Sequence, residues 1–162
     1  MSTPLQLTIA VDPGATGGIA VRFCGQEPYA WPMPDTDGDL RDEIEALTER
    51  ADKEKLKCVA YVEKVGGYVA GVRAPGSAMF RFGEGYGYIR GVLDAHRWEV
   101  RLVRPQAWQK LVGLGTKGKA TRTEWKARLR AEAQRRFPRL KVTNAVADAL
   151  LLLDVSGIGG GE

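Results

Sequence analysis

The sequence predicts an α/β protein with a five-stranded mixed sheet flanked by helices on both faces, and three observations lead to that prediction. Short segments rich in β-branched residues alternate with longer segments whose apolar residues recur every three or four positions. A glycine-rich turn joins the first two short segments, which indicates an antiparallel hairpin. Later strands and helices alternate, as they do in parallel sheets. No repeat or linker interrupts the chain, so we expect a single domain over residues 1–156 and a flexible tail at 157–162.

The first half of the chain is expected to form four strands and one helix: strands at 5–12, 18–24, 29–31 and 58–63, and a helix at 39–55. β-branched and aromatic residues dominate the strand segments. Pro32 and Pro34 are expected to end the third strand, because proline cannot donate to a ladder. The helix is expected because Leu40, Ile44 and Leu47 recur on one face.

The second half is expected to form one strand and four helices: a strand at 98–103 and helices at 77–96, 105–111, 121–137 and 144–155. Pro105 suits the first turn of the helix at 105–111, and Pro138 is expected to end the helix at 121–137. The helix at 77–96 contains Gly83, Gly85, Gly87 and Gly91. Each glycine penalises an isolated helix by about 1 kcal/mol, so close approach of another helix is expected to compensate.

Three acidic residues lie in apolar segments. Asp12 and Glu63 each end a β-branched run, and Asp148 lies in the apolar helix at 144–155. An unpaired charge in such a place is costly, and a divalent cation with oxygen ligands removes that cost. The pattern therefore predicts a metal-dependent phosphodiester site that uses Mg²⁺, with Mn²⁺ able to substitute. Alternatively, Asp12 shapes a turn, Glu63 is a paired strand-end charge and Asp148 is a helix-packing acid.

Basic residues are concentrated in the last third of the chain. Residues 101–141 hold 13 basic and 2 acidic side chains, whereas residues 1–100 hold 11 basic and 15 acidic ones. Such a block is either a solvated face or a surface that binds a polyanion, and its place beside the candidate metal site favours nucleic acid. Nothing resembles a signal peptide or a membrane span of about 20 residues. We therefore expect a cytoplasmic protein with no membrane partner.

Several motifs in a fixed order resemble one family. They read IAVDPG, VAYVEK, SAMFRFGEGYGYIRGVLDA, VRLVRPQAWQK and AVADALLLLD. Over residues 7–154 the chain resembles the RuvC family of Holliday junction resolvases, which have the ribonuclease H-like fold, and the third and fourth motifs are similar to its phage-encoded branch. The resemblance implies a homodimeric, Mg²⁺-dependent crossover junction endodeoxyribonuclease that resolves four-way DNA junctions by paired nicks, in bacterial or phage-infected cells.

The resemblance also implies a two-metal site. Asp12 would bridge two ions, with Glu63 completing one site and Asp148 the other. Relatives usually carry a fourth acid three or four residues before the final aspartate, where this chain has Asn144 and Ala145. Asn144 is therefore interpreted either as a neutral metal ligand or as the N-cap of its helix.

Further roles follow from the resemblance. Lys119 would be a catalytic cation near the scissile phosphate, with Lys117 beside it, although both would otherwise simply contact the DNA backbone. Tyr68 is either a wedge that probes base stacking at the crossover or an ordinary surface residue. Trp108 and Trp125 are expected to be core anchors. Four further residues are expected to bind DNA phosphates: Arg122, Lys126, Arg128 and Arg135.

Other functions stay open at this point. The helix at 77–96 lies at the dimer interface by resemblance, or it packs only against its own sheet. Branched DNA such as forks and flaps is an alternative substrate, and a catalytically weak junction-binding protein is an alternative function because the fourth acid is missing. An actin-like nucleotide-binding protein is a remote alternative, since that class needs two such domains around ATP.

Overall fold

The computed structural model describes residues 5–66 and 76–156. These residues form ten elements: β1 (Gln6–Asp12), β2 (Gly18–Phe23), β3 (Tyr29–Pro32), α1 (Asp37–Glu54), β4 (Lys57–Glu63), α2 (Gly76–Ala95), β5 (Glu99–Val103), α3 (Pro105–Val112), α4 (Arg122–Arg136) and α5 (Asn144–Ser156). The predicted tail at 157–162 lies outside the described residues. Within the described ranges, no helix is both long and apolar enough to cross a membrane.

The five strands form one mixed sheet in the order β3-β2-β1-β4-β5. The hairpin strands β1 and β2 are antiparallel, whereas β1 and β4 are parallel neighbours. Val11 is in register with Val62, so the next residues, Asp12 and Glu63, end their strands at the same end of the sheet. The sheet therefore brings together two acids that lie about fifty positions apart in the sequence.

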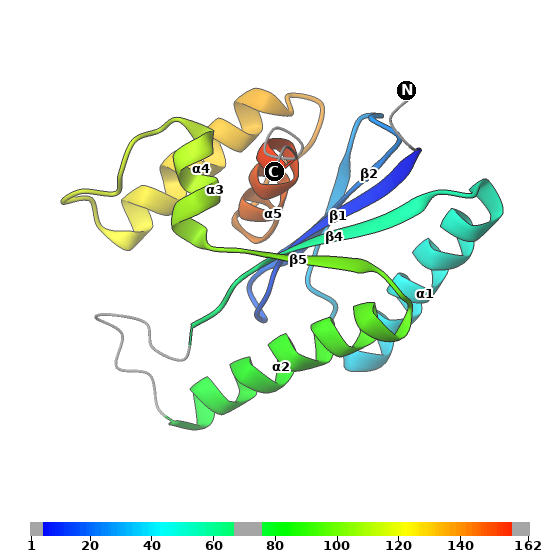
Figure 1. Ribbon diagram of the computed structural model, residues 1–162. Helices are drawn as coiled ribbons and strands as arrows, with labels where there is room; N and C mark the ends of the chain where they lie inside the picture. The colour runs from blue at the N-terminus through cyan, green and yellow to red at the C-terminus, as the bar shows by residue number, and fades with distance from the viewer. Residues whose placement is uncertain (1–4, 67–75, 157–162) are drawn as a thin grey trace.

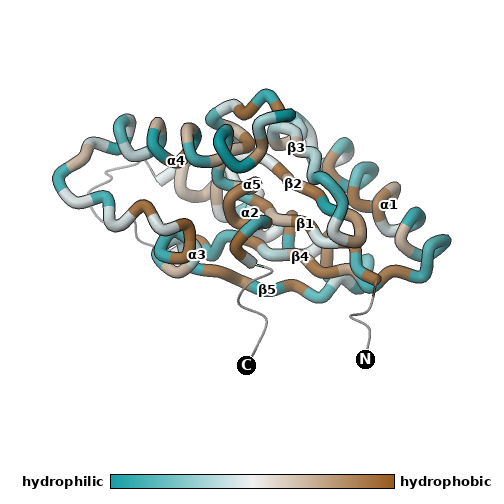
Figure 2. The backbone as a smooth tube through the Cα atoms, turned by 90° about the horizontal axis from the view of Figure 1, so that it is seen from above, coloured by the Kyte–Doolittle hydropathy of each residue, from teal (hydrophilic) through white to brown (hydrophobic). Residues whose placement is uncertain are grey.

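Helices cover both faces of this sheet (Figure 1). Leu7, Ile9 and Val11 of β1 point to the core beneath α1 and α2, while Ala10 points to the core beneath α3, α4 and α5. Hydrophobic residues gather along the central strands and α5 (Figure 2). α5 is the most deeply buried helix, with nine buried residues, eight of them in the hydrophobic core. The predicted fold class is confirmed.

Helix and strand ends follow local hydrogen-bond chemistry. α1 begins two residues earlier than predicted because the Thr36 side chain accepts a hydrogen bond from the Asp39 N–H, at 3.1 Å. At the start of α4, Thr121 and Glu124 form a capping box. Pro32, which was expected to break pairing, is instead the last residue of β3. β3 is an edge strand, where a proline without an N–H is tolerated.

Candidate active site

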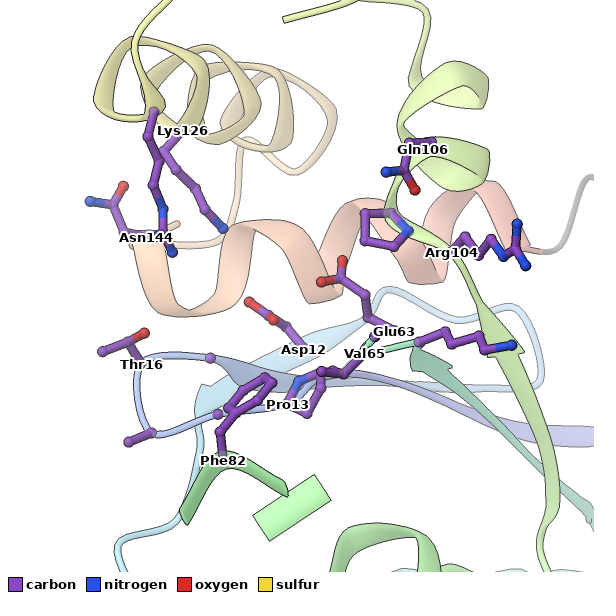
Figure 3. A pocket seen from close by; sticks show the side chains of 17 residues that line it. Asp12, Pro13, Thr16, Glu63, Val65, Phe82, Arg104, Gln106, Lys126 and Asn144 are labelled. Atoms are coloured by element: carbon purple, nitrogen blue, oxygen red, sulfur yellow. The ribbon is translucent and has the colours of Figure 1, made fainter. Parts of the chain in front are cut away.

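The three acids meet at one end of the sheet. An open cleft of about 1120 Å³ lies beyond the ends of β1 and β4, and Asp12 and Glu63 line it. Their carboxylates face the same hollow, and the Lys126 side chain reaches towards them from α4 (Figure 3). Asp148, on α5, is 4% exposed and forms an ion pair with Lys126. The cleft is therefore lined by the ends of β1 and β4, by the turn after β1, and by residues of α2, α3, α4 and α5.

Gly17 fixes the position of Asp12, and Gly18 fixes the position of α5. A Cβ on Gly17 would lie 2.0 Å from the Asp12 carbonyl oxygen, so no larger residue fits this turn without moving Asp12. A Cβ on Gly18 would lie 2.6 Å from the carbonyl oxygen of Ala145, so the first turn of α5 packs directly on β2. That close approach carries Asp148, one helical turn further along, over the end of β1.

Trp108 orients the second acid. Its indole N–H donates a hydrogen bond to Glu63 Oε2 at 2.8 Å, and its side chain is fully buried. Trp108 reaches Glu63 because β5, the neighbour of β4, leads through Arg104 directly into α3. Trp108 was predicted to be a core anchor, and its burial confirms that prediction. Its hydrogen bond to Glu63 was not predicted, although a buried tryptophan N–H usually needs an acceptor.

Trp108→Phe is expected to weaken metal binding while preserving the core, because phenylalanine fills most of the same space and cannot orient Glu63. Loss of such a supporting hydrogen bond typically changes metal affinity by about 10–100-fold. The measurement is a titration of the metal-free protein with Mn²⁺. Trp125→Phe is the matched control, since that indole donates to Gln109 Oε1 at 3.2 Å, away from the acids. Equal metal requirements in the two variants would show that Trp108 is only a core residue.

Lys126 provides positive charge beside Asp148. Its ammonium contacts Asp148 Oδ2, and its side chain is 36% exposed. Asp148 Oδ1 is buried and has no hydrogen-bond partner among the described residues. Lys126 was expected to contact DNA phosphate, and the sequence did not predict its pairing with Asp148. Residues 101–141 contain 13 basic side chains, and no sequence pattern distinguishes Lys126 from the others.

The surroundings of the acids change their protonation. Burial, followed by repulsion from Glu63 and Asp148, raises the pKa of Asp12 from 3.8 to about 7, although Lys126 and Arg122 pull it in the other direction. Burial also raises the pKa of Glu63, against the hydrogen bond from Trp108. Burial alone would lower the pKa of Lys126, but attraction to Asp148, Asp12 and Glu63 raises it. Burial is thus the main cause of the raised pKa values of Asp12 and Glu63, with repulsion between the acids adding to it.

The free energy of unfolding of the metal-free protein is expected to fall as pH rises from about 4 to about 7, through the titration of Asp12. Below pH 3.8, Asp12 is protonated in both the folded and the unfolded state. Between the two pKa values the unfolded chain releases this proton while the folded chain keeps it, which favours unfolding. Urea unfolding in EDTA over a pH series measures the effect. Asp12→Asn should show a flatter profile, and parallel profiles for the two proteins would contradict the raised pKa.

Of the other predicted site residues that the structure describes, two line the cleft and the rest lie outside it. Arg122 and Asn144 line the cleft with the acids. Thr143, not Asn144, occupies the N-cap position of α5, because the Thr143 carbonyl accepts from the Ala147 N–H at 3.1 Å. The Asn144 amide points away from the Asp12 and Glu63 carboxylates (Figure 3). The N-cap interpretation of Asn144 is therefore wrong, and its ligation of metal stays a prediction.

Most of the predicted DNA contacts lie outside the cleft. Lys117 and Lys119 are exposed on the loop between α3 and α4 and do not line the cleft. Arg128 and Arg135 are exposed on α4, and Arg135 pairs with Glu132 at 2.7 Å. Tyr68 lies outside the described residues. The structure thus places Arg122 and Lys126 at the acids and leaves the other basic residues on the surrounding surface.

The donor set fits a hard divalent cation in its chemistry. The three acids supply carboxylate oxygens, and the unpartnered Asp148 Oδ1 is the kind of buried atom that a cation satisfies. Within residues 5–66 and 76–156, however, no three Asp, Glu, His or Cys side chains are grouped closely enough to hold an ion as they stand. Binding therefore requires side-chain movement, and the ion pair between Asp148 and Lys126 is a contact that would have to change.

Comparisons with known proteins support the fold. Two similar solved structures are RuvC from Thermus thermophilus, one described as T. thermophilus RuvC in complex with Holliday junction substrate. The complex has a TM-score of 0.57 and 14% identity over 95% of this chain and 96% of the other. The second has a TM-score of 0.55 and 12% identity over 91% of each chain. No protein-family model and no curated protein matches the sequence. The chain therefore has a RuvC-like fold.

Proposed function

We propose that this protein is a divalent-metal-dependent endonuclease that cuts branched DNA, with four-way junctions as its main substrate. The observation that supports the proposal is that Asp12 and Glu63 line one cleft at the ends of β1 and β4, with Asp148 of α5 paired to the cleft residue Lys126, in a RuvC-like fold. Carboxylates that gather beside a basic segment suit a reaction at a phosphate. The resemblance of residues 77–95 and 100–110 to phage-encoded resolvases would make phage DNA the source of the junctions.

The chain supplies binding and orientation. Asp12, Glu63 and Asp148 would hold two Mg²⁺ ions, with Trp108 orienting Glu63. When bound, the ions supply Lewis-acid activation of water and neutralise charge at the phosphate. Arg122 and Arg104 line the same cleft and would draw the DNA backbone towards the acids. Lys119, on the neighbouring exposed loop, stays a proposed phosphate contact near the scissile bond.

We also propose that the active form is a homodimer in which α2 forms the interface. Phe80 is 67% exposed, and a Cβ on Gly83, Gly87 or Gly91 would meet nothing within 4 Å in the described part of the chain. Among the described residues these glycines therefore have no packing partner, and a second helix approaching them would explain their use. A two-fold dimer would present two clefts to a two-fold junction. The sedimentation mass of the free protein tests this, and a monomer mass at working concentration would contradict it.

The function is tested by incubating purified protein with a labelled four-way junction, a fork and a linear duplex, each with Mg²⁺ or with EDTA. We expect the junction to be cut in Mg²⁺ by paired, symmetric nicks and to be bound but uncut in EDTA. Cutting of forks at an equal rate would favour the debranching nuclease. Junction binding without cutting in either Mg²⁺ or Mn²⁺ would favour the catalytically weak binding protein and overturn the nuclease proposal.

A further inference from the structure

Lys126 lies between the buried acid and the cleft. Its ammonium contacts Asp148 Oδ2, and it lines the cleft itself, whereas Asp148 is not among the described residues that do. A cation entering from solvent therefore meets Asp12 and Glu63 directly but reaches Asp148 only past Lys126. The lysine is in the position of a counter-ion tethered to the protein.

The charges around Lys126 favour this position in metal-free protein. Asp148 attracts the ammonium most strongly, and Asp12 and Glu63 attract it as well. Arg122 also faces Asp12 from the cleft wall, but Asp148 has no other salt bridge among the described residues. Without Lys126, the buried Asp148 would have no salt bridge among the described residues and would still lie beside Asp12 and Glu63, which is unfavourable.

A divalent cation and Lys126 cannot both satisfy Asp148 Oδ2 at full strength. The lysine side chain is 36% exposed and unbranched, so its ammonium has room to swing into the cleft. Asp148 lies within the packed helix α5, which holds the acid in place. The mobile partner of the pair is therefore the lysine.

We propose that Lys126 is a built-in competitor of the metal, whose ammonium holds Asp148 Oδ2 and opposes the binding of an ion by the third acid. This inference rests on the proposed function, because it concerns the same metal site. It predicts that metal loading is weaker in the native protein than in a variant without this charge. Because the displaced ammonium would then face the cleft, a DNA phosphate bound there would favour its displacement, and metal and DNA would strengthen each other's binding.

The test is a titration of metal-free protein with Mn²⁺ in the absence of DNA, with the electron paramagnetic resonance signal of free Mn²⁺ as the readout. Lys126→Met keeps the apolar stem and removes the charge, and it is expected to lower the dissociation constant for Mn²⁺ by about tenfold. Arg130→Met is the matched control, since Arg130 is exposed one turn further along α4 and its loss changes the net charge equally. Its dissociation constant should stay within about twofold of the native value.

A thermal measurement separates competition from a purely structural ion pair. In EDTA, Lys126→Met is expected to melt below the native protein, and saturating Mn²⁺ should raise its melting temperature more than that of the native protein. Lys126→Gln, which keeps a donor for Asp148 without the charge, provides the same comparison if the methionine variant does not fold without metal.

The outcomes are distinguishable. Tighter Mn²⁺ binding by both uncharged variants, with Arg130→Met unchanged, supports the inference. An unchanged or weaker affinity in both variants overturns it, and leaves the nuclease proposal standing if the native protein still cuts junctions. If neither the native protein nor any variant binds Mn²⁺, both the inference and the metal-dependent function are wrong.

Discussion

Asp148→Asn is expected to reduce junction cutting in Mg²⁺ by at least about a thousandfold, because under the proposed function it removes a metal ligand whose contribution at the transition state is several kcal/mol. Asp12→Asn and Glu63→Gln should have effects of similar size. All three variants should still bind a four-way junction in EDTA, since each removes negative charge beside the phosphates. The measurement is single-turnover cutting of a labelled junction beside binding in the same buffer without metal.

Asp154→Asn is the matched control for Asp148→Asn. Both acids lie on α5 and form ion pairs, but Asp154 pairs with Arg136 at 2.8 Å and with Arg22 at 3.6 Å, away from the cleft. Its loss is expected to lower the melting temperature without lowering the cutting rate of the folded protein. Near-normal cutting by any one of the three site variants would remove that acid from the site.

Gly17→Ala is expected to lower the free energy of unfolding by at least about 2 kcal/mol and to reduce cutting more than tenfold in the molecules that remain folded. The added Cβ would lie 2.0 Å from the Asp12 carbonyl oxygen and 3.1 Å from the Asp12 side chain. The backbone has to move to relieve that overlap, and Asp12 moves with it. Urea unfolding gives the stability change, and cutting at a temperature well below the melting transition gives the activity.

Gly38→Ala separates a steric effect from a general effect of replacing glycine. Gly38 lies in the first turn of α1, where the nearest atom to a Cβ is 3.7 Å away, an ordinary contact. This substitution is expected to leave cutting unchanged and to be neutral or slightly stabilising, as alanine is in a helix. Equal losses in both variants would contradict the steric argument.

The sequence predicted most of the fold because its signals are local. β-branched runs, a glycine-rich turn and helical spacing placed all ten elements within about two residues of their bounds. The order β3-β2-β1-β4-β5 was not predicted, because pairing between strands depends on contacts that no local pattern contains. Chemical reasoning predicted one site for Asp12, Glu63 and Asp148; the structure places Asp12 and Glu63 in the cleft and Asp148 behind it, paired with Lys126.

The supporting residues were harder to predict. Trp108 is 45 positions from Glu63, and only the pairing of β4 with β5 shows that α3 begins beside that acid. Lys126 belongs to a segment with so many basic residues that no pattern distinguishes the one that pairs with Asp148. Thr143 took the N-cap position expected of Asn144 because both residues are good caps and differ by one place in the chain.

The burial of α5 has a consequence for how this protein can fail. Many enzymes lose a ligand when a loop or a helix end frays, and they become inactive while most of the molecule is still folded. Here the helix that carries Asp148 also contributes eight residues to the hydrophobic core, and its first turn packs directly on Gly18 of the central hairpin. The third acid is therefore part of the most cooperative region of the molecule, so activity and global folding should be lost together as denaturant rises.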